Sequence, residues 1–357
     1  MALPFAPSAR ANPPNRFERV HLAEMPELGF AASPDDPPED PRTELLVDPS
    51  RTIIATNDSP DLGFGASVNP YRGCQHACAY CYARPTHEYL GYSAGLDFQT
   101  KILVKPRAAE LLRKQLMSPA WKPQVVALSG VTDPYQPAER RLRITRGCLE
   151  VLAEFKNPVG IVTKGFLVTR DIDVLAELAR ADAASVMLSI TTLDAELQRK
   201  MEPLASPPSK RLAAIEALAR AGVPVGVMAA PVIPGLTDHE LPAILQAAAD
   251  AGASSAGMVV LRLPHGVKEL FSDWLAEHFP ERREKVLNRL RSLHGGALYD
   301  SRFAHRQRGA GEFAAQIEAL FQLGLRKARL ASRGPTLSIA KFRRPGAVDQ
   351  LSLFSSP

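Results

Sequence analysis

The sequence predicts an α/β protein with a parallel sheet and helices packed outside it. Six short apolar, β-branched runs start at residue 66, and an amphipathic stretch follows each run. The units recur at intervals of roughly 25 to 35 residues, as strand–helix units in a right-handed parallel sheet do. Gly222 and Gly252 each end a helical stretch just before the next run, which is the usual punctuation between a helix and a strand.

The elements follow in order along the chain. The expected strands are residues 66–70, 124–130, 159–165, 185–191, 223–233 and 255–263, and the expected helices are residues 82–90, 144–155, 171–181, 209–222, 239–252 and 268–279. Residues 1–50 are rich in proline and acidic residues and predict a flexible leader. Residues 51–280 then form the core domain, and residues 281–357 form a basic, helical C-terminal extension that packs beside the core and ends loosely.

Composition sets the broad class. The chain has 357 residues, of which 45% are hydrophobic and 23% charged, as in ordinary soluble globular proteins. No stretch approaches the roughly 18 apolar residues of a membrane span, and the N-terminus lacks the pattern of a secretory signal. We therefore expect a cytoplasmic protein without a membrane partner. The net charge of +5 is compatible with an anionic partner and does not by itself require one.

The chemistry-bearing motif is a run of three cysteines, Cys74, Cys78 and Cys81, out of four in the chain. Such clustering without an export signal indicates metal ligation. Three thiolates leave one iron of a cubane cluster open to a small molecule, whereas electron-transfer ferredoxins supply a fourth cysteine. Gly73 lets the loop approach the cluster closely.

Two other interpretations of these cysteines exist. A structural zinc would take His76 or His87 as a fourth ligand, but such sites usually pair two knuckles separated by a longer stretch. Buried free thiols in a core would follow one face of a strand or helix, and this spacing does not. An iron-sulfur cluster is therefore favoured.

The loop at residues 69–84, placed after a first strand, resembles the radical S-adenosylmethionine (SAM) superfamily. Together with residues 129–139, 162–165 and 231–238, it is similar to the branch of spore photoproduct lyase and DNA repair photolyase-like proteins. The resemblance implies a partial (β/α)6 TIM-like barrel over roughly residues 65–275. It also implies a [4Fe-4S] cluster and SAM as cofactors, with a flavodoxin- or ferredoxin-type electron donor. Reductive cleavage of SAM would then give a 5'-deoxyadenosyl radical that abstracts hydrogen from a substrate.

In such a barrel the loops after the strands' carboxyl ends form the site. Residues expected to contact SAM are Tyr80, Ser129, Gly130, Thr132, Asp133, Thr163, Lys164, Ser189, Thr191, Arg211 and Ile233. Asp133 stands where the family has Gly-Gly-Glu, absent here, and either binds the SAM amino group or caps a turn. Lys164 either pairs with a carboxylate or phosphate or is solvated.

The other candidates have equally plain alternatives. Ser189 and Thr191 share a strand face and reach the ribose or methionine, or simply end a strand. Arg211 resembles the family's basic residue near the SAM carboxylate, or makes a salt bridge. Tyr80 and Ile233 flank the adenine, or Ile233 belongs to the core.

Candidates for a hydrogen donor or relay are Tyr82, Tyr135 and Cys148. Cys148 lies among apolar residues at helical spacing and is interpreted as a core residue. Spore photoproduct lyase relies on a cysteine donor, and no cysteine here stands at a matching place, which argues against thymine-dimer repair.

The function expected from these observations is that of a radical SAM enzyme with an unidentified substrate, for which nucleic acid is one candidate. The basic segments at residues 302–309, 326–329 and 341–344 either track phosphates or form solvated faces. The alternative function is a non-catalytic iron-sulfur protein for electron transfer or redox sensing.

Overall fold

The six predicted strands form one parallel sheet in a computed structural model that describes residues 23–24, 43–128 and 130–346. Its order is β11-β10-β9-β8-β7-β4-β3, so the parallel strands lie side by side in chain order. They are β4 (Ala66–Val68), β7 (Val126–Leu128), β8 (Val159–Thr163), β9 (Ala184–Ser189), β10 (Val225–Val232) and β11 (Ser255–Val260). The predicted α/β partial barrel is confirmed. An edge strand that the sequence did not suggest, β3 (Ile54–Thr56), pairs antiparallel with β4.

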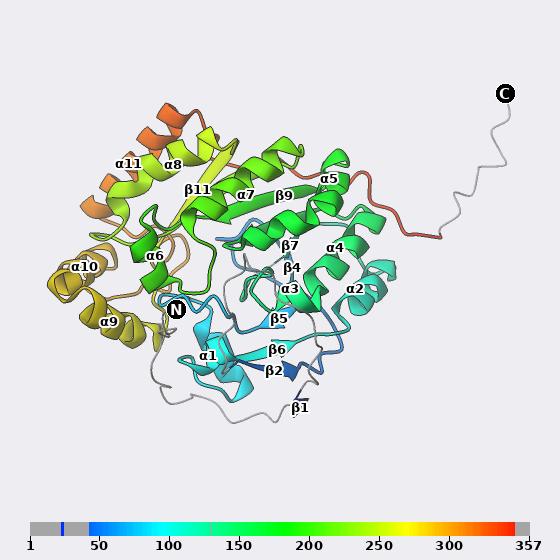
Figure 1. Cartoon of the computed structure of the whole chain (residues 1–357), viewed down its shortest axis with the longest axis horizontal. Coiled ribbons are helices and arrows are strands. Elements are labelled where there is room, and N and C mark those ends of the chain that lie inside the picture. The colour runs from blue at the N-terminus through cyan, green and yellow to red at the C-terminus, as the bar shows by residue number, and fades with distance from the viewer. Residues whose placement is uncertain (1–22, 25–42, 129, 347–357) are drawn as a thin grey trace, which may run out of the picture.

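Helices cover the outside of this sheet (Figure 1). Those that follow parallel strands are α3 (Glu139–Leu142), α4 (Ile144–Phe155), α5 (Ile172–Arg180), α6 (Ala195–Met201), α7 (Pro208–Arg220), α8 (Leu241–Asp250) and α9 (Val267–His278). Short 3-10 helices, η2 (Phe166–Asp171) and η3 (Asp238–Glu240), precede α5 and α8. The expected helix at residues 82–90 is the 3-10 helix η1 (Arg84–Leu90).

A second, smaller sheet combines two strands that precede β4 in the sequence with two that lie between β4 and β7. Its order is β1-β2-β6-β5, formed by β1 (Ala23–Glu24), β2 (Glu44–Val47), β6 (Lys101–Val104) and β5 (Tyr71–Arg72). Two helices flank β6, namely α1 (Asp97–Thr100) and α2 (Ala108–Met117). Strand β2 lies inside the expected leader, because its register with β6 draws residues 44–47 into the sheet. The rest of the expected leader, apart from residues 23–24 and 43–50, lies outside the described residues.

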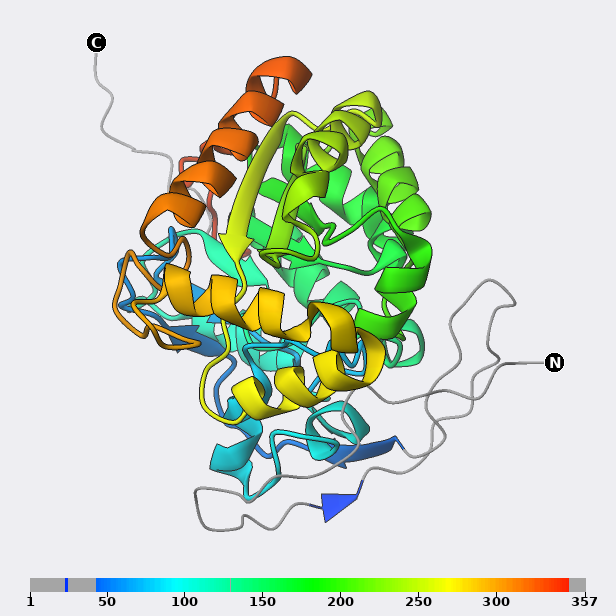
Figure 2. The same cartoon turned by 90° about the vertical axis from the view of Figure 1, so that its left-hand side faces the viewer.

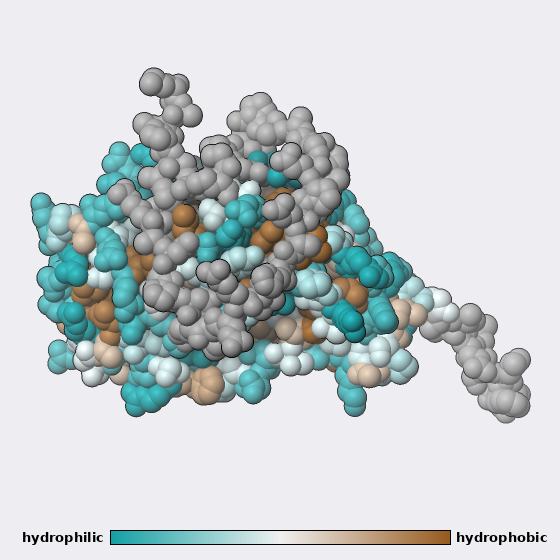
Figure 3. Space-filling model, turned by 90° about the horizontal axis from the view of Figure 1, so that it is seen from below, coloured by the Kyte–Doolittle hydropathy of each residue, from teal (hydrophilic) through white to brown (hydrophobic). Residues whose placement is uncertain are grey.

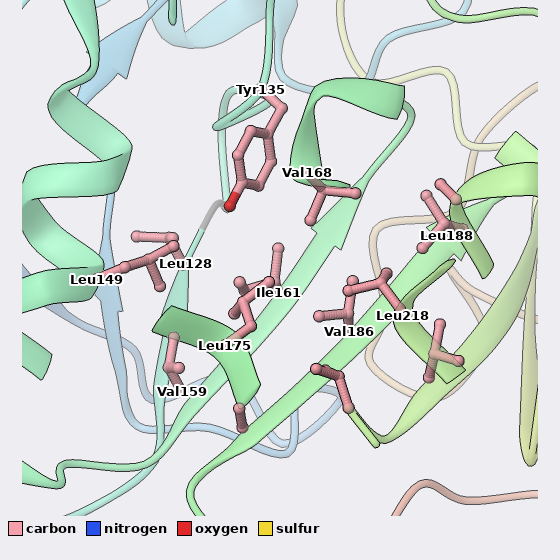
Figure 4. Close-up of a cluster of buried hydrophobic side chains, with 14 of the residues drawn as sticks. Leu128, Tyr135, Leu149, Val159, Ile161, Val168, Leu175, Val186, Leu188 and Leu218 are labelled. Carbon is pink, nitrogen blue, oxygen red and sulfur yellow. The ribbon is translucent and has the colours of Figure 1, made fainter. Parts of the chain in front are cut away.

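The main core lies between the sheet and its helices (Figure 4). Side chains of β7, β8 and β9 meet those of α4, α5 and α7 there, among them Leu128, Ile161, Val186, Leu149, Leu175 and Leu218. Each is almost fully buried, and burial of one such side chain stabilises the fold by about 1.5–3 kcal/mol. The strands are consequently held rigidly, and their carboxyl ends can position loops.

The C-terminal extension contains α10 (Pro280–Leu293) and α11 (Glu312–Ala328), and α11 packs on α8. In Figure 2, β11 points towards the pair α9 and α10. The extension is attached to the core as far as residue 343, and the predicted loose end at residues 347–357 lies outside the described residues. Ala331 bridges to Ser255, the backbone N–H of Ser338 donates to Asp182, and that of Arg343 donates to Phe155.

The basic residues at the end of that segment face the amino-terminal side of the sheet. The Arg344 guanidinium donates to the carbonyl oxygens of Leu116, Ser118 and Trp121 at 3.2, 3.1 and 3.0 Å. Lys341 donates to the Arg180 carbonyl at the end of α5 at 3.2 Å. These cations bind carbonyl oxygens in and just after the last turns of α2 and α5.

The surface is mixed in character. On the face seen in Figure 3, hydrophilic residues surround smaller apolar patches wherever the atoms are not grey. Among the residues described, no helix is both long and apolar enough to cross a membrane.

Candidate active site

The three motif cysteines lie in one loop, residues 73–83, at the carboxyl end of the first parallel strand. All three are free thiols; Cys74 and Cys78 are buried and Cys81 is half-buried. Cys74 packs with Ala83 in one apolar cluster and Cys78 packs with Tyr80 in another, and Cys81 contacts both clusters. The loop therefore brings its three sulfur side chains to one region.

Backbone N–H groups are directed at two of these sulfurs. The N–H of His76 lies near the Cys74 sulfur and that of Ala83 near the Cys81 sulfur, while the N–H of Arg84 donates to the Cys81 carbonyl at 3.2 Å. Burial raises the pKa of both thiols despite these N–H groups. N–H donors to sulfur are a feature of iron-sulfur loops, where they tune bound thiolates.

Glycine at position 73 is required by the loop's geometry. Gly73 has φ of +79°, and a Cβ placed on it would lie 2.9 Å from both His87 Cε1 and the Phe98 carbonyl oxygen. That same oxygen accepts the N–H of Cys74 at 3.0 Å. Gly73 therefore lies closely against Phe98 and His87, and its close approach to a cluster stays a prediction.

Side-chain amides clamp the loop to the segment after β7. The N–H of Gln75 donates to Gln136 Oε1 at 2.9 Å, and Gln75 Oε1 accepts from the N–H of Ala138 at 2.6 Å. Thr132 Oγ1 donates to the Gly73 carbonyl at 2.6 Å. Both glutamines are fully buried, so these bonds fix the backbone on either side of Cys74.

Arg84 holds the other side of the loop. It is fully buried, and its guanidinium donates to the Cys78 carbonyl at 3.1 and 3.0 Å and to the Gly95 carbonyl at 2.7 Å. Its carbon Cζ also lies 5.5 Å from the centre of the Phe98 ring. A buried cation thus ties the cysteine loop to residues 94–99 beside it.

The donor set fits a cubane cluster better than a single ion. In the part of the chain that the structure describes, no group of three His, Cys, Asp or Glu side chains could hold one metal ion. A single ion needs all donors about 2.0–2.3 Å from one point, whereas each thiolate of a cubane binds a different iron. One ring nitrogen of each proposed fourth zinc ligand has another partner: His87 Nε2 is 2.8 Å from the Lys101 carbonyl, and His76 Nδ1 is 3.3 Å from Asp133.

A second polar group lies at the ends of β8 and β9, around the fully buried Glu202 that follows α6. Tyr80 Oη donates to Glu202 Oε1, Thr191 Oγ1 donates to the same oxygen at 2.7 Å, and Lys164 Nζ lies 3.3 Å from it. Arg211 donates to the other oxygen. Four of the predicted SAM-contact residues therefore converge on one carboxylate.

The charges in this group keep Glu202 ionised. Burial alone raises the pKa of a carboxyl group, but the cations of Arg211 and Lys164 and the Tyr80 hydrogen bond outweigh it here. Together they hold the pKa of Glu202 well below its ordinary value. Lys164 also donates to the Ala230 carbonyl at 3.1 Å, and its Nζ lies 5.7 Å from the centre of the Tyr80 ring.

Asp133 is occupied by contacts within the protein. Its oxygens accept from the N–H of Tyr135 at 2.9 Å, Thr163 Oγ1 at 2.6 Å and the N–H of Lys164 at 2.8 Å. Burial opposes ionisation, yet His76 and these donors lower the pKa of Asp133 below its ordinary value. The turn-forming alternative for Asp133 matches these contacts, and a role towards SAM stays a prediction.

The remaining predicted contacts are placed as follows. The N–H of Gly130 donates to Asn69 Oδ1 at 2.9 Å. The carbonyl of the buried Ser189 accepts from Arg211 at 2.9 Å. Ile233 is fully buried with Tyr80 and Cys78 in one apolar cluster. Ser129 lies outside the described residues.

The three donor candidates have different surroundings. Tyr82 is 49% exposed, and its hydroxyl donates to the Gly130 carbonyl at 2.8 Å. Tyr135 is buried in the main core, where its ring lies among Leu128 and Val168 (Figure 4). Cys148 is fully buried in the same core on α4, as its apolar spacing predicted. Neither core residue shares an apolar cluster with the three motif cysteines.

Sequence reasoning missed Glu202, Arg84, Gln75 and Gln136. Polar residues in irregular loops carry no periodic signal, because burial there depends on which distant loop packs against them. Arg84 and Gln75 stand inside the cysteine motif, and that proximity was the available signal.

Comparison with known proteins agrees with this geometry. The family model of the radical SAM superfamily matches residues 68–248. An uncharacterized protein of Mycobacterium tuberculosis is 43% identical over 240 residues, covering 67% of this chain and 69% of the relative. An uncharacterized protein of Methanocaldococcus jannaschii is 29% identical, covering 48% of this chain and 62% of the relative.

Among solved structures, spore photoproduct lyase complexed with dinucleoside spore photoproduct has a TM-score of 0.57 and 18% identity, covering 79% of each chain. A mutant of spore photoproduct lyase with bound AdoMet and the same dinucleoside gives a TM-score of 0.54 and 16% identity, with the same coverage. At such identity, the likeness concerns the fold.

The chain thus belongs to the radical SAM superfamily, and it is an enzyme. Within that class, its fold is similar to that of spore photoproduct lyase.

Proposed function

We propose that Cys74, Cys78 and Cys81 hold a [4Fe-4S] cluster whose fourth iron binds SAM, and that the protein uses it for radical chemistry on a substrate. The observation that carries the proposal is the ligand count. Three free cysteines share one loop, while Cys148, the only other cysteine in the sequence, lies in the main core. A three-thiolate cubane keeps one iron open.

When bound, the cluster and SAM would supply one-electron reduction of the sulfonium and a carbon radical. The protein's own task is to bind, orient and shield them. Gly73 and Arg84 would keep the loop in the shape that the cluster needs, and Lys164 would face the carboxylate of SAM. The apolar wall of Tyr80 and Ile233 would exclude water from the adenine. Ser129, Gly130, Thr132, Thr163, Ser189 and Thr191 stay predicted contacts.

The test is anaerobic reconstitution with iron and sulfide, followed by SAM and dithionite, with 5'-deoxyadenosine as the product measured. We expect the wild type to form it and Cys74→Ala, Cys78→Ala and Cys81→Ala to lose it. Cys148→Ala is the matched control, because uncoupled SAM cleavage needs no protein hydrogen donor. An iron-sulfur protein limited to electron transfer or sensing would form none. The physiological electron donor, of flavodoxin or ferredoxin type, and the cytoplasmic location remain part of the proposal.

For the substrate we propose nucleic acid, on the basis of a rim at the carboxyl end of the sheet. The centre of the exposed Tyr82 ring lies 5.0 Å from the guanidinium carbon of Arg262. The centre of the Phe303 ring, which is 52% exposed, lies 4.6 Å from the guanidinium carbon of Arg306. The N–H of Val260, the last residue of β11, donates to the Gln307 carbonyl at 2.8 Å, so residues 302–309 lie beside the end of that strand.

Two interactions hold this rim in place across the open side of the barrel. The Asp61 carboxylate accepts from the N–H of Ala304 at 2.7 Å and from Arg306 at 2.5 Å. Exposed aromatic rings beside arginines are the arrangement that stacks unpaired bases, and the exposed Arg308 adds positive charge, whereas Arg302 is paired with Asp300 at 2.7 Å. The basic residues at 341–344 do not support this proposal, since Arg344 and Lys341 donate to carbonyls at the opposite end of the barrel.

The substrate proposal is tested with single-stranded and duplex oligonucleotides. Tyr82→Leu and Phe303→Leu should each weaken single-strand binding by about 1–3 kcal/mol. Arg308→Ala should reduce the salt dependence of binding by about one phosphate contact. Arg343 is also exposed but lies at the opposite end of the barrel, so Arg343→Ala should leave the salt dependence unchanged. Binding that none of these changes weakens would redirect the search to protein substrates.

A further inference from the structure

Glu202 occupies an unusual position among the residues near the cysteine loop. Its side chain is 0% exposed, and it gathers contacts from four different parts of the fold. Oε1 accepts from Tyr80 of the cysteine loop and from Thr191 beyond β9, and lies 3.3 Å from Lys164 at the end of β8. Oε2 accepts from Arg211 on α7.

The two cations around Glu202 are not equivalent. Arg211 is 1% exposed, and it also donates to the carbonyls of Ser206 at 2.6 Å and Ser189 at 2.9 Å. The Arg211 guanidinium therefore has all of these partners within the protein. Lys164 is 14% exposed, and its other acceptors, Thr191 Oγ1 at 3.2 Å and the Ala230 carbonyl at 3.1 Å, are neutral, so Glu202 balances only one of the two positive charges. The surplus charge at Lys164 suits an anionic group of a ligand in the barrel mouth.

We propose that Glu202 is a positioning residue that fixes Lys164 relative to the cysteine loop. Tyr80 immediately precedes Cys81, so the bond between Tyr80 and Glu202 ties the loop to the same carboxylate that holds Lys164. The distance between the cluster and the cation facing SAM is then set before SAM binds. This inference rests on the proposed function, since it assigns a role towards SAM.

Loss of the Glu202 charge has two separable consequences. Arg211 is left buried without its counter-charge, which destabilises the fold whatever its function. Lys164 also loses its charged partner and keeps only the neutral acceptors Thr191 and Ala230, so it gains rotamer freedom that a ligand must remove on binding. Only the second consequence weakens SAM binding, and a control that reproduces the first one alone can separate them.

Glu139 provides that control. It is likewise 0% exposed, and its carboxylate accepts from a tyrosine, Tyr71 at 2.5 Å, and from an arginine, Arg170 at 2.7 Å. It contacts none of the residues that meet Glu202. Glu139→Gln therefore matches Glu202→Gln in burial of the carboxylate, in partner types and in the charge that is removed, although Arg170 also pairs with Asp171 at 2.8 Å.

The experiment measures equilibrium SAM binding to the reconstituted, oxidised protein, where no turnover occurs, together with iron per chain and the melting temperature. Glu202→Gln should raise the Kd for SAM at least tenfold, which is about 1.4 kcal/mol, with iron per chain unchanged. Glu139→Gln should also lower the melting temperature, less than Glu202→Gln because Arg170 keeps Asp171 as a counter-charge, and it should leave the Kd within about twofold of wild type because it removes no contact of Lys164 or Tyr80. An unchanged Kd in Glu202→Gln, or an equal rise in Glu139→Gln, overturns the inference.

Tyr80→Phe covers the case in which Glu202→Gln does not fold. It keeps the ring and both charge pairs and removes only the hydroxyl that reaches Glu202. Loss of one buried hydrogen bond worth about 1 kcal/mol should raise the Kd about fivefold, and a Kd equal to wild type overturns the inference. If the wild type itself binds no SAM, the proposed function fails, which is a different outcome from failure of the Glu202 role alone.

Discussion

Replacing Gly73 with alanine should abolish cluster binding through a displacement whose size follows from the structure. An alanine Cβ would lie 2.9 Å from the Phe98 carbonyl oxygen, about 0.5 Å inside the 3.4 Å at which ordinary contacts begin. That oxygen is backbone and holds the N–H of Cys74, so the loop itself must shift. Metal sites tolerate ligand displacements of about 0.2 Å, and the required shift is larger.

Backbone strain contributes separately, and a second glycine isolates it. Gly73 has φ of +79°, which costs a residue with a Cβ about 1–2 kcal/mol. Gly222 has φ of +74° but no atom within 4 Å of the position that a Cβ would take, so Gly222→Ala carries the strain without the clash. Both variants should have a lower melting temperature than the wild type.

The assay is iron and sulfide per chain after anaerobic reconstitution, with the visible absorption of the cluster as a second measure. Gly73→Ala should take up little iron and Gly222→Ala as much as the wild type. A full cluster in Gly73→Ala would refute the steric reasoning. Equal iron loss in both variants would assign the effect to general destabilisation.

Two further predictions concern stability. Arg344→Ala should lower the free energy of unfolding by about 1.5–3 kcal/mol, because it removes a charged donor from three carbonyls. Arg343→Ala is the control and should lower it by no more than about 0.5 kcal/mol, because the exposed Arg343 guanidinium makes one long contact of 3.4 Å. Equal losses in chemical denaturation would contradict the stabilising role of Arg344. Burial lowers the pKa of His87 to about 4 from 6.5, so the unfolded chain takes up a proton before the folded one, and stability is lost as pH falls from 6.5 towards 4, by about 3 kcal/mol in total. His87→Gln should remove that part of the pH dependence of unfolding, and an unaltered pH profile would count against it.

The fold was predictable from sequence where the pattern is periodic. All six parallel strands and helices such as α4, at residues 144–155, follow from apolar spacing alone. The smaller sheet was not predictable, because β2 and β5 are four and two residues long and are defined by pairing with β6 rather than by their own pattern. Residues 331–344 were missed for the same reason, since their partners lie far away in the sequence.

The candidate site was predictable as a list of residues and not as a network. Ligand chemistry identifies the cysteines, strand-end position identifies Lys164 and Thr191, and resemblance to the family's basic residue identifies Arg211. What links these three is Glu202, whose burial arises only when α6 returns its C-terminal end to the barrel mouth. Asp133 illustrates the converse, because its strand-end position suggested a ligand contact while its oxygens accept three donors from the protein.

Mössbauer spectroscopy of the anaerobically reconstituted protein, recorded with and without SAM, tests the open iron corner most directly. The account predicts a [4Fe-4S] cluster in which SAM alters one iron site and leaves the other three unchanged. A spectrum that SAM does not alter, with all four irons held by protein ligands, would contradict it.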